Sequence, residues 1–216
     1  MRRILLVLVL VLCGLWSASQ ARAASICNAV VGNIVANCGF ETGDFTSWTL
    51  GGNTTNPGGV YYGVDAFDAN SGNYGAYMSQ DLFVGTATVN LSQMLSTSAG
   101  LYEVTFWLEQ DTAPNVGYTH LFSAAWAGTT FLSLTPTVAL PGTVELFTHY
   151  SFTGTATAAS TILALTFQND DSFWSFDDVS ATLTPEPSTG LLGGMALGVV
   201  LLMVAGEKRA ASRRPN

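Results

Sequence analysis

Short runs in which apolar and polar residues alternate constrain the fold of this chain more than any other feature. In residues 101–110, LYEVTFWLEQ, one side of a strand would carry Tyr102, Val104, Phe106 and Leu108. This period of two is that of a β-strand, and no stretch shows a sustained helical period. Similar runs are VELFTHYSFTG, TILALTFQND and THLFSAAWAGTTFLSL, the last of which predicts two strands that turn at Ala127-Gly128. Gly, Asn, Pro and Ser separate them, so the sequence predicts an all-β fold, a two-layer antiparallel β-sandwich of the jelly-roll type.

Residues 51–80 differ from these runs because they are rich in Gly, Asn and Tyr. We expect long loops here, on one side of the sandwich, where binding residues often lie. The stretch contains DANSGN, which partly matches a calcium loop. The twelfth positions, counted from Asp65 and Asp68, are Ala76 and Ser79, so the glutamate that completes an EF-hand is missing.

The N-terminal residues 1–23 have a basic start, an apolar run and small residues at their end. This pattern predicts a secretory signal peptide, cleaved between Ala23 and Ala24. Cys13 raises the alternative of a lipoprotein. Leu12 precedes it where a small residue is needed, which argues against lipidation.

The C-terminus has a pattern in three parts. Pro185-Glu186-Pro187 ends the preceding structure, because proline cannot donate to a sheet ladder. Residues 189–205 carry no charge and are long enough for a short transmembrane helix. Four Lys and Arg residues follow, and the positive-inside rule places them in the cytoplasm. A plain single-pass anchor is the alternative interpretation.

With this pattern, residues 185–216 resemble the PEP-CTERM sorting signal, whose family also carries an N-terminal signal peptide. The resemblance implies a Gram-negative bacterium that makes an extracellular polysaccharide matrix. It also implies processing by an exosortase near the Pro-Glu-Pro motif. The precursor would then be anchored in the membrane, and the product would reach the cell surface or the matrix.

Residues 24–184 remain as one domain with a core of its own. All seven Lys and Arg residues lie outside this body, whereas only Glu186 and Glu207 of the fifteen acidic residues do, which leaves thirteen carboxylates inside. Nucleic-acid binding is excluded, because phosphate contacts need Lys or Arg. Two interpretations stay open: a solvated acidic surface, or specific binding of a cation.

The body keeps two cysteines, Cys27 and Cys38. In an exported protein, an isolated pair of cysteines predicts a disulfide, here contributing about 3 kcal/mol. The alternatives, a metal site or a nucleophile, need a histidine nearby in the sequence, and none is present.

GFETGDFTSW near the start of the body and DDVSATL at its end resemble carbohydrate-binding modules and galactose-binding-like domains. The resemblance implies that the first and last strands lie side by side and hold a structural calcium ion. The early ligand position matches Glu41 and the late one matches Asp177 or Asp178, whereas Cys38 stands where the family has a glycine. Because the body has no Lys or Arg to neutralise its carboxylates, a bound calcium ion could balance their charge. In the alternative interpretation, Glu41 caps a turn and the aspartates are solvated.

Aromatic rings offer flat apolar faces to a sugar ring. Trp107 lies on the mixed face of its strand, and Tyr61, Tyr62 and Tyr74 come from the expected loops, so these four residues are the candidate polysaccharide ligands. The alternative for Trp107 is burial under a loop. Three other tryptophans are expected in the core: Trp48, Trp126 and Trp174.

Catalysis has little support in the sequence. Two carboxylates suffice for a glycosidase, yet these acids lie at turns and strand ends. His120 and His149 are far apart in sequence, and no Gly-x-Ser-x-Gly motif is present. We therefore expect that this protein is not an enzyme. The sequence predicts an exported, exosortase-processed surface or matrix protein with a structural or interaction role in a biofilm. The alternative is a calcium-stabilised carbohydrate-binding module.

Overall fold

The computed structural model describes six stretches of the chain: residues 24–54, 62–79, 88–110, 118–135, 146–170 and 172–185. The chain divides into two units, Met1–Leu183 and Thr184–Asn216. Of the second unit only Thr184 and Pro185 are described. The first unit contains the predicted body.

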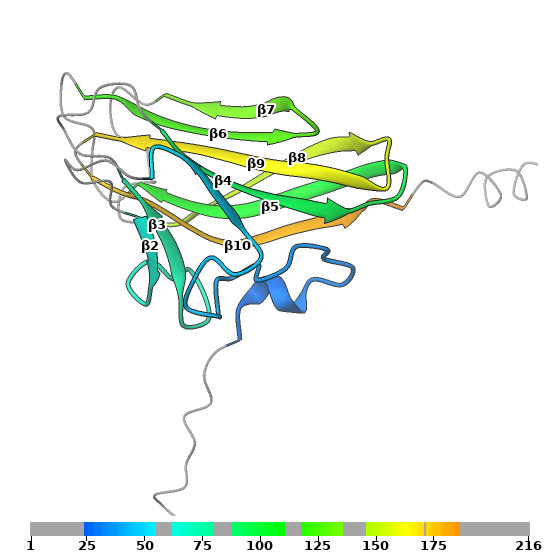
Figure 1. Ribbon diagram of the computed structural model, residues 1–216. Coiled ribbons are helices and arrows are strands. Elements are labelled where there is room, and N and C mark those ends of the chain that lie inside the picture. The colour runs from blue at the N-terminus through cyan, green and yellow to red at the C-terminus, as the bar shows by residue number, and fades with distance from the viewer. Residues whose placement is uncertain are drawn as a thin grey trace, which may run out of the picture. The chain divides into compact units, whose positions relative to one another are not determined.

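Two five-stranded antiparallel sheets form this body (Figure 1). The first sheet has the order β1-β4-β9-β6-β7, and the second has the order β2-β3-β10-β5-β8. A short 3₁₀ helix, η1, precedes them at Ile26–Ala29. The strands are β1 Thr49–Gly52, β2 Tyr62–Asp65, β3 Gly75–Met78, β4 Val89–Ser96, β5 Gly100–Gln110, β6 His120–Trp126, β7 Thr129–Leu134, β8 Thr148–Ala156, β9 Ser160–Asn169 and β10 Trp174–Leu183. The predicted all-β sandwich is confirmed.

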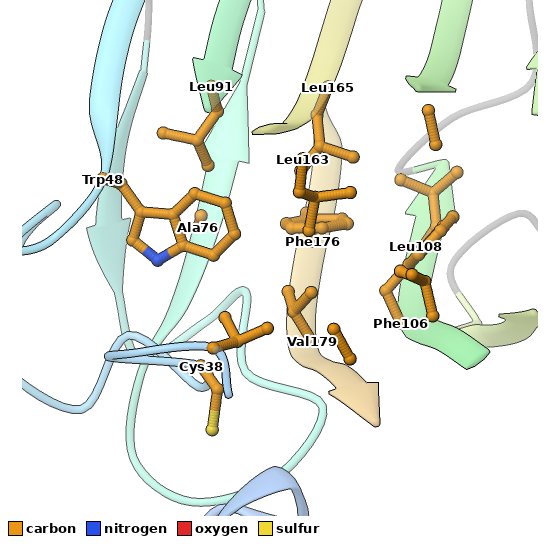
Figure 2. Close-up of a cluster of buried hydrophobic side chains, with 14 of the residues drawn as sticks. Cys38, Trp48, Ala76, Leu91, Phe106, Leu108, Leu163, Leu165, Phe176 and Val179 are labelled. Atoms are coloured by element: carbon orange, nitrogen blue, oxygen red, sulfur yellow. The ribbon is translucent and has the colours of Figure 1, made fainter. Parts of the chain in front are cut away.

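The core lies between the two sheets and follows the alternation of the sequence. In β5, Tyr102, Val104, Phe106 and Leu108 are buried, while the residues between them are exposed or half-buried. Phe176 of β10 lies at the centre, amid Phe106 and the leucines of β9 (Figure 2). Aromatic rings that pack in this way add to the stabilisation from apolar burial. The three tryptophans expected in the core are all buried.

Several local predictions are confirmed and others are wrong. The chain turns between β6 and β7 at Ala127 and Gly128, as predicted, and both residues have positive φ. Residues 51–80 are not only loops, because β2 and β3 lie within them. No strand forms over residues 37–48, which make successive turns, and the first strand begins at Thr49.

The predicted targeting segments fall largely outside the described residues. β10 ends at Leu183, two residues before Pro185. The signal peptide (1–23) and the transmembrane helix (189–205) have no described structure. No helix in the described part of the chain is long and apolar enough to cross a membrane.

Candidate functional site

The candidate site begins with an irregularity in β10. Its pairing with β5 shifts between Asp177, opposite Trp107, and Ser180, opposite Thr105. Consecutive residues of a regular strand point to opposite faces, whereas a bulge breaks this alternation. Asp178 has a φ of 53°, and both aspartates reach the outer face of the sheet. Asp177 lies within β10, which begins three residues earlier, at Trp174.

The segment 24–38 lies along β10, where it extends the sheet in place of a strand. Ile34 N–H donates to the Ala181 carbonyl (3.1 Å), and Val179 N–H donates to the Cys38 carbonyl (2.9 Å). The resemblance implied that the first and last strands are neighbours. This is wrong for β1, which pairs with β4 in the other sheet. The irregular segment 24–38 takes that place.

A disulfide between Cys27 and Cys38 ties this segment together, as predicted. The two Cα atoms lie 6.1 Å apart, and the bridge closes a sequence separation of 11 residues. For a loop of this size the constraint on the unfolded chain contributes about 3 kcal/mol. It holds Ser25 and Cys27 next to the carboxylate of Asp178.

Asp178 joins the two termini of the body. Its Oδ1 accepts hydrogen bonds from Ser25 Oγ (2.5 Å) and from the Cys27 N–H (3.3 Å). Its Oδ2 accepts from Asn70 Nδ2 (2.8 Å) and Ser71 Oγ (2.7 Å). Only 3% of this residue is exposed. One carboxylate therefore fastens the N-terminal segment and the loop 66–74 to β10.

Asp177 and Glu41 hold the backbone of the loop 66–74. Asp177 Oδ2 accepts from the N–H groups of Asn70 (2.9 Å) and Ser71 (3.1 Å). Glu41 accepts from the Asn73 N–H and side-chain amide, both at 2.7 Å, and from the Tyr74 N–H at 3.2 Å. The three carboxylates predicted to act together thus bind one loop.

Gly72 lets Glu41 reach this loop. Its φ is +73°, and a Cβ added there would lie 2.1 Å from Glu41 Oε1. Glycine adopts such a conformation without steric cost, whereas a side chain would displace the carboxylate. The DANSGN stretch is therefore shaped to receive carboxylates.

Burial shifts the titration of two aspartates in this region. Burial and the neighbouring Asp178 carboxylate raise the pKa of Asp177 to about 8, although backbone N–H donors act in the opposite direction. Burial also raises the pKa of Asp68 to about 7, with smaller contributions from the charges of Asp65 and Glu109. Ser175 Oγ donates to Asp68 and opposes that shift.

Glu41, Asp177 and Asp178 have the oxygen ligands that calcium prefers. Each of their carboxylate oxygens already accepts at least one hydrogen bond. Among the described residues, no group of three or more His, Cys, Asp or Glu side chains is placed to hold a metal ion. A calcium ion here would therefore replace some of these hydrogen-bond donors.

The outer face of the second sheet thus has two parts, which we call the covered half and the open half. The covered half comprises the outward residues of β10, namely Ser175, Asp177, Asp178 and Ser180, all of which are buried. The segment 24–38 and the loop 66–74 contact the first three of them. Figure 1 shows both covering segments below β10. The open half comprises the outward residues of β5 and β8, namely Glu103, Thr105, Trp107, Glu109, His149, Ser151 and Thr153, which are exposed or half-buried.

Trp107 and His149 form an aromatic pair in the open half. They are direct cross-strand partners, and their ring centroids lie 5.0 Å apart at an interplanar angle of 47°. Trp107 is half-buried and His149 is exposed. Cross-strand pairing therefore gives Trp107 a neighbour that the spacing of residues along the sequence did not reveal.

The predicted tyrosine ligands do not gather around Trp107. Tyr62 packs against Phe45, with ring centroids 6.1 Å apart, and borders the core. The ring of Tyr74 lies next to Gly43. Tyr61 lies outside the described residues.

Two further aromatic residues lie in this region: Tyr77, which the sequence placed among the loop tyrosines but which belongs to β3, and Phe67, which sequence reasoning missed. Tyr77 of β3 is paired with Ser175, and burial together with the charges of Asp65 and Asp68 raises its pKa. Phe67, in the loop, is 96% exposed. An aromatic residue between polar loop residues was the signal available for Phe67, whereas the position of Tyr77 follows only from the strand register.

The other acid and base candidates have structural roles. Asp44 accepts hydrogen bonds from Thr42 Oγ1 and the Thr46 N–H within an exposed turn. Hydrogen bonds from Thr46 and Thr42 lower its pKa. His120 is buried, and its Nδ1 lies 3.2 Å from Gln110 Nε2.

Comparison with known structures places the fold. The module TmCBM61, in complex with β-1,4-galactotriose, matches with a TM-score of 0.51 and 19% identity, over 70% of this chain and 99% of that chain. A cyclase from Fischerella sp. TAU matches with a TM-score of 0.53 and 16% identity, over 73% and 99%. No model of a known protein family matches the sequence, and no curated protein does. At these identities the likeness shows the fold, a β-sandwich like that of a carbohydrate-binding module.

Proposed function

We propose that this chain is an exported, non-catalytic β-sandwich that binds a polysaccharide at the cell surface or in the extracellular matrix. Export and exosortase processing rest on the patterns of residues 1–23 and 185–216. The intact mass of the secreted protein tests both cleavages. The body then acts outside the cell as an interaction module of the matrix.

The Trp107–His149 pair is the observation that carries this proposal. The pair lies in the open half, between hydroxyl and carboxylate side chains. Sugar sites commonly combine an aromatic face, which stacks on the sugar ring, with polar groups that fix its orientation. The likeness in fold to a module that was solved with galactotriose is a further reason to expect a sugar.

Affinity electrophoresis of the full-length chain in gels that contain matrix polysaccharide tests this function. We expect retardation of the native protein, and a roughly ten-fold weaker interaction for Trp107→Ala, because aromatic anchors dominate such contacts. Phe131→Ala is the matched control, since Phe131 is an exposed aromatic residue of the other sheet. If Trp107→Ala is retarded as strongly as the native protein, this site is wrong.

A calcium ion at Glu41, Asp177 and Asp178 is the second part of the proposal. Three carboxylates meet at one loop, and the body has no Lys or Arg to balance them. A cation that binds only the folded state stabilises it, and the stabilisation grows with the logarithm of the free cation concentration once this exceeds the Kd. We expect the thermal midpoint to fall on addition of a chelator and to recover with calcium. An unchanged midpoint would contradict a calcium site.

A further inference from the structure

The charge of the body restricts which polysaccharide the open half can accept. Residues 24–184 contain thirteen carboxylates and no Lys or Arg, because two of the fifteen acidic residues and all seven basic ones lie outside. A polymer of uronic acids or sulfated sugars carries the same sign of charge as this body. The net charge of the body therefore disfavours acidic glycans.

Two carboxylates lie on the same face of β5 as Trp107. Glu109 is its neighbour on the same face of β5, about 7 Å along the strand, and Glu103 lies about twice as far in the other direction. Glu103 is exposed. The charge of Glu109 acts on Asp68, which lies at the border of the covered half. The aromatic pair is thus flanked by negative charge on both sides along β5.

An aromatic ring beside carboxylates is suited to a cation. The face of a tryptophan ring attracts an ammonium group, and nearby carboxylates add a Coulombic attraction. His149 is the only basic side chain in the described part of the open half. A neutral sugar would gain from stacking alone, whereas an amino sugar would gain from stacking and from charge.

We propose that the open half binds polymers of amino sugars with free amino groups, such as de-N-acetylated hexosamine, in preference to N-acetylated or uronic-acid polymers. This inference rests on the proposed function, because it names the ligand class of the same site. Trp107 stacks on one sugar ring, and Glu109 and Glu103, on opposite sides of Trp107 along β5, face ammonium groups at other positions of the same sugar chain.

Isothermal titration of the full-length chain with oligomers of equal length tests the ligand class. The oligomers are glucosamine, N-acetylglucosamine and galacturonate, at mildly acidic pH where the glucosamine amine is protonated. We expect the glucosamine oligomer to bind about ten-fold more tightly than its acetylated form at low salt. This advantage should shrink at high salt, because salt screens exposed charges.

Two charge variants locate the effect. Glu103→Gln should weaken binding of the glucosamine oligomer by about three-fold, the size of one exposed ion pair, and leave the acetylated oligomer unaffected. Asp44→Asn removes the same charge from an exposed turn outside the open half, and should leave both affinities unchanged. Trp107→Ala should weaken both oligomers.

The failures of the two proposals can be told apart. Equal or tighter binding of the acetylated or the galacturonate oligomer would overturn the ligand class and leave sugar binding intact. Glucosamine binding that survives Trp107→Ala unchanged, or that a lysine oligomer matches, would mean unspecific attraction to an acidic surface and overturn the site. If no oligomer or matrix polysaccharide binds, the proposed function fails as well.

Discussion

The covered and open halves of the second sheet contain similar residues that have different roles. Both present carboxylates and hydroxyl groups from neighbouring strands, and Asp177 is the direct partner of Trp107. In the covered half every carboxylate oxygen of Asp177 and Asp178 accepts a hydrogen bond from the chain. In the open half, Glu103 and His149 are exposed to solvent.

The two halves have similar residue types, and they differ in whether other segments of the chain bury them. This burial separates the structural part of the face from the part that is available to a ligand. A buried carboxylate must be satisfied by hydrogen bonds, a proton or a metal, because its desolvation is costly. Asp177 and Asp178 meet that requirement through segments that are distant in sequence. Removing a carboxylate from each half should therefore have very different consequences.

Asp178→Ala should produce the largest effect. It removes the acceptor of four hydrogen bonds, two of which come from the Ser25 and Ser71 hydroxyls. We expect the free energy of unfolding in urea to fall by about 3 kcal/mol or more.

Glu103→Ala is the control from the open half, and it should change the free energy of unfolding by less than about 0.5 kcal/mol. Similar losses for the two variants would break the distinction between the halves. Hydrogen exchange should show increased opening of the loop 66–74 in Asp178→Ala alone.

The sequence allowed the sandwich, its core and the disulfide to be predicted, because each depends on local information. The alternation in β5 fixed which residues point inward, and two cysteines allow only one intramolecular pairing. The grouping of Glu41 with Asp177 and Asp178 also followed, although from a resemblance. In this structure they meet at one loop.

What the sequence did not reveal depends on register and on non-local contacts. The bulge in β10 turns Asp178 outward. No residue type in this part of the sequence predicts the bulge. Asn70, Ser71 and Asn73 were visible only as a polar loop, because their partners lie more than thirty residues away. His149 became a neighbour of Trp107 only once β8 was aligned with β5.

An intermediate effect on the free energy of unfolding is expected from pH, through the titration of Asp68 at the border between the halves. The pKa of Asp68 is raised from 3.8 to about 7, so the folded state holds a proton that the unfolded state has lost. The stabilisation is complete below about pH 4 and is lost as the pH rises through about 7.

We therefore expect Asp68 to lower the free energy of unfolding by about 1–2 kcal/mol over this window, after allowance for solvent screening. Asp177, whose pKa is also raised, acts in the same direction. Urea unfolding at a series of pH values measures the slope, and Asp68→Asn should flatten it. An unchanged slope in that variant would show that Asp68 does not carry the effect.

The smallest effect on stability should come from Trp107→Ala, and this sharpens the comparison most. Trp107 lies outside the core, so its loss should cost less than about 1 kcal/mol, whereas Trp126→Ala should cost about 3–5 kcal/mol. Thermal and urea unfolding measure both variants. A loss for Trp107→Ala as large as for Trp126→Ala would make the aromatic pair part of the scaffold. A small loss, combined with weakened sugar binding, would show that the open half is kept for a ligand, because its largest side chain then contributes little to folding.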